Sequence, residues 1–160
     1  DPVWIRSSGA ASDRLALHDQ PSVTQLLATQ KAAKAAYSAA GLTANDIDLA
    51  EVHDCFTIAE LMATEDLGFT DHGQGGVFAR EGRGVRNEGA VCINPSGGLK
   101  SKGHPLGATG TGQAVEVFKQ LRGTVEDSRQ VRDAETGLTH NVGGSGATCA
   151  VHIFGRERNG

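Results

Sequence analysis

The chain has 160 residues, a formal net charge of −4 and an aromatic content of 4%. This length suits a single domain with a sizeable core, and the negative charge gives no support for binding to nucleic acid or to an anionic membrane surface. No apolar run approaches the length of a membrane span, and no basic and apolar N-terminal stretch predicts a secretory signal.

In chain order, weak alternation over residues 3–8 predicts a short strand, and residues 9–19 are predicted to form a loop. A long helix then begins at Ser22, which fits a capping box with Gln25. The helix continues through apolar residues at helical spacing and stops at Gly41. Because its middle is rich in alanine, we expect this helix to pack closely against a sheet.

Residues 47–52 give the strongest strand signal, and they lead directly into His53-Asp54-Cys55-Phe56. A second capping box, Thr57 with Glu60, predicts a helix that ends at Gly68. The histidine and the cysteine therefore lie at the carboxyl end of a strand, where open α/β sheets place their ligands.

After residue 69, and besides the glycine-rich stretch described below, the chain is predicted to contain two loops, one helix and three strands. The loops are a long glycine-rich excursion, which we interpret as a lid or an interface arm, and a polar segment after the helix. The predicted ranges are a loop over 70–87, a strand over 90–93, a helix over 112–121, a loop over 122–136 and strands over 138–142 and 147–154 around a turn at 143–146. This alternation predicts an α/β layered domain.

The glycine-rich stretch over residues 94–112 is the most informative part of the chain. Its glycines allow backbone N–H groups and a ligand to come close together, and the helix that follows adds unpaired N–H groups. His104 lies in the middle, beside Pro105, which restricts the backbone of its neighbour. The histidine is either a catalytic base or oxyanion donor on a rigid loop, or an incidental residue of a long turn.

The three cysteines, Cys55, Cys92 and Cys149, are odd in number and lack C-x-x-C spacing. This pattern favours reduced thiols in a cytoplasmic protein. Cys55 precedes a helix N-terminus, which favours the thiolate, although a small buried hydrophobe is the alternative. The other two lie in apolar strands and are predicted to be buried. We expect no metal site, because no paired-ligand spacing is present.

Three stretches together resemble thiolases. Residues 94–110 resemble the Gly-His-Pro loop of that family, and residues 51–56 resemble the His-Asp-Cys-Phe variant of a loop that elsewhere reads Asn-Glu-Ala-Phe. Residues 141–147 stand at the place of the C-terminal Cys-x-Gly motif. The most similar subgroup is the sterol-carrier-protein-type thiolases, also called lipid-transfer proteins or acetyl-CoA acetyltransferases.

The resemblance implies a thiolase-like layered fold, of which this chain forms one βαβαββ half with a mixed sheet and helices. Residues 1–160 would be the C-terminal domain, and the N-terminal half that bears the nucleophilic cysteine would be absent from this chain. The resemblance also implies a homo-oligomer, such as a dimer, in the full-length form.

The resemblance further implies roles for individual residues. His104 would activate the nucleophile and help to bind the thioester oxygen, and His53 would position a water in an oxyanion hole. Asn141 replaces the usual second cysteine, so the acid/base thiol would come from Cys55 instead. A thiol can exchange a proton near neutral pH. Gly143 would give its N–H to a second oxyanion hole.

Substrate-binding roles are implied for Phe56, Gly103 and Ser96. Phe56 would line the pantetheine channel, with a place in the core as the alternative. Acyl-CoA and free coenzyme A are the implied substrates, and no bound cofactor is expected.

The implied function is an acyl-CoA C-acyltransferase, which cleaves 3-ketoacyl-CoA or condenses acyl-CoAs, and this chain alone would be inactive. One alternative is a thiolase-fold retro-aldolase acting on steroid side-chain CoA esters. Those relatives use tyrosines, whereas the only tyrosine here, Tyr37, is predicted in a helix. The other alternative is a non-catalytic lipid- or acyl-CoA-binding subunit that works with a zinc-ribbon/OB-fold partner.

Overall fold

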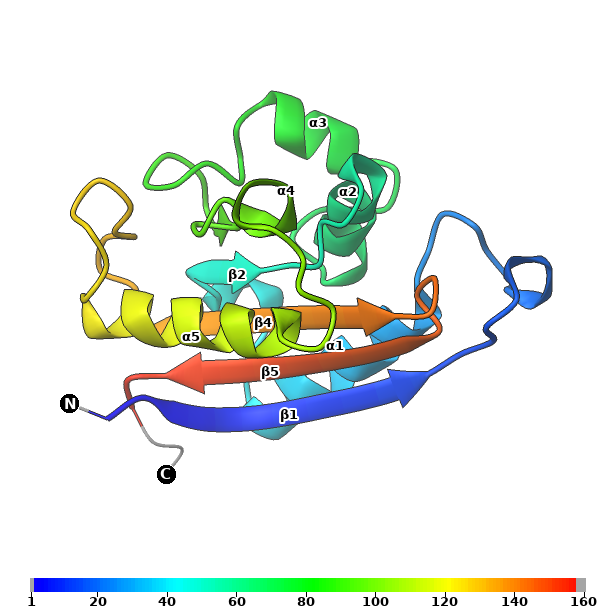
Figure 1. Cartoon of the computed structure of the whole chain (residues 1–160), viewed down its shortest axis with the longest axis horizontal. Helices are drawn as coiled ribbons and strands as arrows, with labels where there is room; N and C mark the ends of the chain where they lie inside the picture. Colours follow the sequence, from blue (N-terminus) through cyan, green and yellow to red (C-terminus); the bar gives the residue numbers. More distant parts are fainter. Residues whose placement is uncertain (1, 158–160) are drawn as a thin grey trace.

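A five-stranded mixed sheet forms the centre of the computed structural model, which describes residues 2–157 (Figure 1). The strand order is β1-β5-β4-β2-β3; β1, β5 and β4 pair in antiparallel fashion, and β4, β2 and β3 pair in parallel. The strands are β1 (Trp4–Ser12), β2 (Leu49–Glu51), β3 (Cys92–Ile93), β4 (Thr136–Gly143) and β5 (Thr148–Gly155). The predicted α/β class with a mixed sheet is confirmed.

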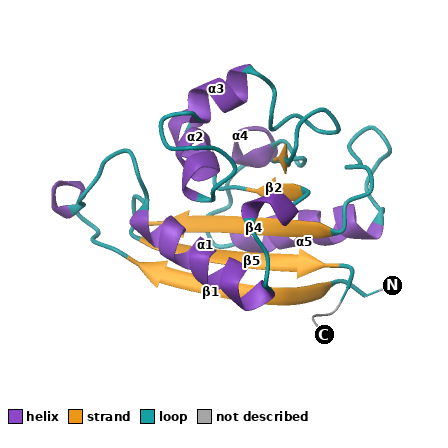
Figure 2. Cartoon of the chain, turned by 180° about the vertical axis from the view of Figure 1, so that it is seen from behind, coloured by secondary structure: helices purple, strands orange, loops and turns teal. Residues whose placement is uncertain are grey.

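The helices lie on both faces of the sheet and beyond its β3 edge. They are α1 (Leu27–Ala40), α2 (Thr57–Asp66), α3 (Gly75–Arg80), α4 (Gly98–Lys102) and α5 (Thr109–Arg122), with single 3₁₀ turns at Leu17–Asp19 and Ala44–Asp46. Figure 2 shows α1 across one face, over β1 and β5, while α5 covers β4 and β2 on the other face in Figure 1. No helix within residues 2–157 is long and apolar enough to cross a membrane.

The close packing predicted for the alanine-rich helix is confirmed. Ala28, Ala32 and Ala36 recur every fourth residue of α1, and all three are fully buried. Without larger side chains in the way, β1 approaches the helix so closely that a Cβ on Gly9 would overlap the Ala32 carbonyl oxygen. The Ser7 hydroxyl also donates to the Ala36 carbonyl oxygen at 2.8 Å.

Strand β1 extends to Ser12, so the loop predicted over residues 9–19 is wrong in its first four positions. The cause is tertiary. Strand β5 pairs with β1 as far as Ser12 opposite Thr148, and this ladder supplies hydrogen bonds that weak local alternation does not reveal. The predicted hairpin between β4 and β5 is confirmed.

Both predicted capping boxes are wrong. Helix α1 begins at Leu27 rather than Ser22, and neither α1 nor α2 has a local side-chain cap. At the start of α1, the backbone N–H of Leu26 donates to Asp66 Oδ2 at 2.6 Å, so a residue of α2 satisfies this amide. At the start of α2, the Glu60 carboxylate instead accepts from Asn94 Nδ2 at 3.2 Å.

The segment over residues 70–87 is not the loop that its composition predicts. It contains α3, which packs on α2 through a buried Phe78, and the Gly75 N–H donates to Glu65 Oε1 at 2.7 Å. A Cβ on Gly75 would lie 2.6 Å from the Leu61 carbonyl oxygen. Glycine is therefore used here for close helix–helix contact, a signal that composition alone cannot separate from a loop.

We expect the Gly9→Ala substitution to lower the free energy of unfolding by about 1–3 kcal/mol, because the new Cβ must displace the α1 backbone. Urea denaturation of the chain measures this change. The matched control is Ala10→Ser on the exposed side of the same strand, which should change stability by less than about 0.5 kcal/mol. Equal stabilities of the two variants would contradict the close β1–α1 contact.

Candidate active site

Four segments of the chain line one cleft of about 650 Å³, and three of them carry residues to which the sequence assigned site roles; the fourth lies over residues 17–26. The loop after β2 contributes His53, Cys55 and Phe56, the glycine-rich loop contributes His104, and the β4–β5 turn contributes Gly143. Five of the seven residues to which the sequence assigned site roles are thus brought together. Phe56 is 68% exposed, so the alternative place in the core is wrong for this residue.

The other two predicted residues do not line this cleft. The Ser96 hydroxyl donates to Glu51 Oε2 at 2.7 Å, and its backbone N–H donates to Glu51 Oε1 at 3.0 Å. Gly103 ends α4 with φ +94°, directly before His104. Both residues therefore shape the loop that carries the histidine, and their predicted contact with substrate stays a prediction.

The two histidines of the cleft lie in contact. The ring centroids of His53 and His104 are 4.8 Å apart, and the rings meet edge to face at 88°. Burial lowers the pKa of His53, the nearby His104 lowers it further, and the Asp54 carboxylate opposes both effects. His53 therefore takes up a proton at a lower pH than an ordinary histidine does.

The start of α5 holds the His104 ring. Its Nδ1 lies 2.7 Å from Thr109 Oγ1, and the threonine hydroxyl in turn donates to the Pro105 carbonyl oxygen at 3.1 Å. Because this hydroxyl has one hydrogen and gives it to the carbonyl, its oxygen accepts from His104 Nδ1–H. The neutral His104 ring therefore carries its hydrogen on Nδ1 and has a lone pair on Nε2.

A third histidine, His140, lies on β4 and is fully buried. Its Nε2 is 2.9 Å from Thr29 Oγ1 on α1, and its Nδ1 accepts from the His53 backbone N–H at 3.4 Å. Burial, with a smaller contribution from His53, lowers the pKa of His140 to about 3. His140 is thus a neutral support beneath the cleft, a role that the sequence did not reveal.

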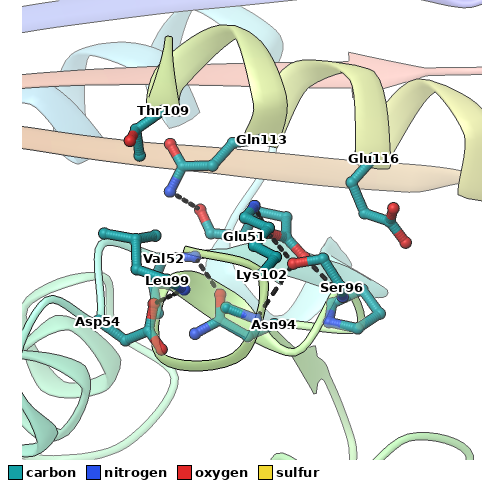
Figure 3. A network of polar contacts seen from close by, with 12 residues as sticks. Glu51, Val52, Asp54, Asn94, Ser96, Leu99, Lys102, Thr109, Gln113 and Glu116 are labelled. Carbon is teal, nitrogen blue, oxygen red and sulfur yellow. Dashed lines mark hydrogen bonds and ion pairs between the residues drawn. The ribbon is translucent and has the colours of Figure 1, made fainter. Parts of the chain in front are cut away.

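The buried carboxylate of Glu51, at the end of β2, anchors the glycine-rich loop (Figure 3). Besides the two hydrogen bonds from Ser96, its Oε2 accepts from Lys102 Nζ at 2.9 Å. Removing a carboxylate from water is costly unless its charge is paired and hydrogen-bonded. Here both oxygens are engaged, and all the partners come from the loop.

Asp54 and Asn94 complete this attachment. Asp54 Oδ1 accepts from the Leu99 backbone N–H at 2.7 Å, and Asn94 Oδ1 accepts from the Val52 N–H at 2.8 Å. Gly98, with φ +65°, lies so close to Asp54 that a Cβ would overlap the carboxylate. We call these contacts of Glu51, Asp54 and Asn94 the loop clamp.

Among the three cysteines, Cys55 alone lines the cleft and is half-buried. The predicted burial of Cys92 and Cys149 is confirmed. Burial raises the pKa of Cys92 to about 12 and that of Cys149 to about 11. These two thiols lack the thiolate character that proton exchange or nucleophilic attack requires. Within residues 2–157, no group of three His, Cys, Asp or Glu residues is placed to hold a metal ion.

Sequence reasoning missed the buried polar residues of α5, one of which, Gln113, supports the site, although one signal was present. Gln113, Glu116 and Gln120 recur at helical spacing on the face of α5 that also carries Val117 and Leu121, and all are buried. Polar residues on a core-facing stripe need specific partners. For Gln113 these partners are backbone carbonyl oxygens of β2 and β4.

Residues 9–156 match a family model described as thiolase C-terminal domain-like. Over 155 residues, the chain is 54% identical to an acetyl-CoA acetyltransferase of Methanothermobacter thermautotrophicus. This alignment covers 97% of this chain and 40% of that protein. The chain is also 49% identical over 119 residues to sterol carrier protein 2 of Homo sapiens. That alignment covers 74% of this chain and 21% of that protein.

Two solved structures share the fold. The match to an Ltp2–ChsH2(DUF35) aldolase has a TM-score of 0.85 at 23% identity and covers 99% of this chain and 40% of that chain. The match to a monomeric SCP2-thiolase-like protein type 1 from Mycobacterium smegmatis has a TM-score of 0.70 at 18% identity. It covers 98% of this chain and 30% of that chain. The chain thus spans at most 40% of the length of each of these four proteins.

The loop clamp predicts that Gly98→Ala lowers the free energy of unfolding by at least about 2 kcal/mol, through backbone strain and a displaced buried carboxylate. Urea denaturation measures the loss. Gly112→Ala in α5 is the control, because its Cβ would meet nothing within 4 Å and alanine favours a helix. A Gly98→Ala variant as stable as Gly112→Ala would refute the clamp.

The buried neutral His140 predicts that stability falls on acidification. The unfolded state takes up a proton near pH 6.5, whereas the folded state resists until about pH 3, so the free energy of unfolding decreases across this interval, by about 1.4 kcal/mol per pH unit. His140→Asn should flatten this slope in urea denaturation series. The exposed His18→Asn variant should keep it, and parallel curves for all three proteins would contradict the assignment.

Proposed function

The chain belongs to the thiolase C-terminal domain-like family, and on this basis we propose that it is the C-terminal catalytic half of an acyl-CoA C-acyltransferase. The proposed reaction is thiolytic cleavage of a 3-ketoacyl-CoA by free coenzyme A, or the reverse condensation of two acyl-CoAs. We further propose that the nucleophilic cysteine comes from an N-terminal half outside these 160 residues, because the chain covers 40% of its acetyltransferase relative.

The observation that carries the proposal is the meeting of His53, Cys55 and His104 at one cleft. Cleaving or forming a bond between an α-carbon and a thioester carbonyl needs an acid/base for the α-carbon, activation of a nucleophile and donors for the developing oxyanions. The cleft offers a thiol, two imidazoles and the glycine turn at Gly143 for these tasks.

We assign His104 as the base that activates the nucleophilic cysteine. Its Nδ1 hydrogen is engaged with Thr109, so Nε2 is the nitrogen left to accept the proton of the incoming cysteine thiol. The resulting thiolate attacks the 3-keto carbonyl carbon, and the bond between C2 and C3 then breaks. The acyl group stays on the cysteine until coenzyme A displaces it. The coenzyme A thiol gives its proton to the Cys55 thiolate formed in the first half-reaction, and the released cysteine thiolate recovers its own proton from His104.

We assign Cys55 as the acid that protonates the leaving group. The C2 carbanion that departs as acetyl-CoA needs a proton, and the Cys55 thiol supplies it at the cleft wall. In condensation the same sulfur removes the proton from C2. The half-buried position of Cys55 supports this role, because a fully buried thiol could not reach the substrate.

His53 and Gly143 are assigned to oxyanion stabilisation, and Phe56 to the wall of the pantetheine channel. The supporting observations are that all three residues line the cleft and that Phe56 keeps most of its surface exposed. Backbone N–H groups and imidazole N–H groups are common donors at such sites.

No observation favours the aldolase alternative. It needs a tyrosine at the site, and Tyr37 lies on α1, where its hydroxyl donates to the Leu67 carbonyl oxygen at 3.0 Å and burial raises the pKa of the phenol. The similarity to the Ltp2–ChsH2(DUF35) aldolase concerns the fold. A homo-oligomer and a zinc-ribbon/OB-fold partner remain proposals that we attach to the full-length enzyme.

The test combines the chain with the part of the Methanothermobacter acetyl-CoA acetyltransferase that it does not cover, and follows acetoacetyl-CoA consumption with free coenzyme A. We expect turnover for the unsubstituted chain and losses of at least about 100-fold for Cys55→Ala and for His104→Ala. Cys92→Ala is the matched control, because this buried thiol lies outside the cleft, and it should retain turnover.

Normal turnover of Cys55→Ala or His104→Ala would show that the assigned roles are wrong. If the chain bound acyl-CoA but gained no activity with this or any other N-terminal half, the non-catalytic subunit would replace the enzyme as the favoured function.

A further inference from the structure

We propose that Gln113 is a positioning residue that selects the ring tautomer of His53 through Asn141, so that the cleft receives a hydrogen-bond donor from His53 and an acceptor from His104. The consequence for catalysis rests on the proposed function. The tautomer itself is a property of this chain and is measurable without any reaction.

The relay begins with the orientation of the Gln113 amide. This side chain is fully buried on α5, and its Nε2 donates to the His140 carbonyl oxygen at 3.0 Å and to the Glu51 carbonyl oxygen at 3.3 Å. Backbone carbonyl oxygens only accept hydrogen bonds. The NH₂ group of Gln113 must therefore face β2 and β4, and Figure 3 shows it directed at the Glu51 carbonyl oxygen; Oε1 is left as an acceptor.

The second step is the orientation of Asn141. Gln113 Oε1 lies 3.2 Å from Asn141 Nδ2, and an acceptor oxygen requires the NH₂ end of its partner. The same Nδ2 lies 3.4 Å from His53 Nδ1. Since Asn141 presents an N–H to the ring, His53 Nδ1 must be the acceptor. The one hydrogen of the neutral imidazole is then on Nε2.

The opposite tautomer holds for His104, whose Nδ1–H is given to Thr109. The two histidine rings, which are in edge-to-face contact, therefore both leave Nε2 unused but differ in its protonation: His53 has Nε2–H, and His104 has an Nε2 lone pair. Among residues 2–157, neither Nε2 has a hydrogen-bond partner. A donor for an oxyanion and an acceptor for a proton thus lie side by side.

A purely structural role is the competing explanation for Gln113, because its amide also ties β2 to β4. Loss of such a tie would lower stability and would leave the tautomer of His53 unchanged. The two explanations therefore differ in a spectroscopic signature, since the ring ¹⁵N shifts of a histidine distinguish the nitrogen that carries hydrogen from the one that does not.

The experiment records two-bond ¹H–¹⁵N correlations of the histidine rings in the chain at about pH 8, above the ordinary histidine pKa of about 6.5. We expect Nε2–H for His53 and Nδ1–H for His104. Asn141→Asp replaces the donor by an acceptor and should move the His53 hydrogen to Nδ1. Asn141→Leu, which offers neither, should give a mixture of both tautomers.

Gln113→Met should also give a mixture at His53, because the Asn141 amide loses its orientation. His104 serves as an internal reference in every variant, since Thr109 holds it independently. The exposed Asn45→Asp variant controls for the added charge and should leave both rings unchanged. If Gln113→Met fails to fold, the His53 shifts of Asn141→Asp and Asn141→Leu still show whether Asn141 selects the His53 tautomer.

An Nδ1–H His53 in the unsubstituted chain, or a His53 tautomer that no Asn141 variant changes, would overturn the proposal. A Gln113→Met variant that folds and keeps pure Nε2–H would remove Gln113 from the relay. In the combined enzyme, we expect Asn141→Asp to lower kcat at least tenfold with little change in KM. Absence of turnover in the unsubstituted enzyme, with the predicted tautomers present, would instead count against the proposed function alone.

Discussion

Two carboxylates at the end of β2, Glu51 and Asp54, hold the glycine-rich loop against the sheet, and the geometry of the cleft depends on them. His53 lies between them in the chain, and the loop that they hold ends at His104. One attachment therefore sets the positions of both imidazoles. Because the partners of the carboxylates are backbone N–H groups, Ser96 and Lys102, the loop must keep one conformation to satisfy two buried charges.

The glycines of the loop follow from the same constraint. Gly97 and Gly98 both have positive φ, and Gly98 lies against the Asp54 carboxylate with no space for a Cβ. The glycine-rich composition, which predicted close approach of a ligand to the backbone, here permits close attachment of backbone to side chain. The result is a loop that presents His104 on a rigid support, which is what the role proposed for this residue requires.

Uncharged polar groups orient the rest of the site. His140 stays neutral because it is fully buried, and it binds the backbone of His53 rather than its ring. Gln113 and Asn141 lie on the other side, between the sheet carbonyl groups and the His53 ring. Such a network of neutral groups orients His53 without adding a charge of its own.

The sequence by itself determined the α/β class, the closely packed alanine-rich helix and the three motifs that converge at the cleft, because periodicity and residue type are local properties. Only the tertiary structure decided that Asp66 of α2 accepts from the backbone N–H at the start of α1, and that Glu60 of α2 binds Asn94. It also decided that Ser96 belongs to the loop clamp and that His140 supports His53. Contacts such as Thr29 with His140, 111 residues apart in the chain, exist only after folding has brought their elements together. Hydrogen-bond direction at the site depends on such contacts, so it cannot be derived from sequence spacing.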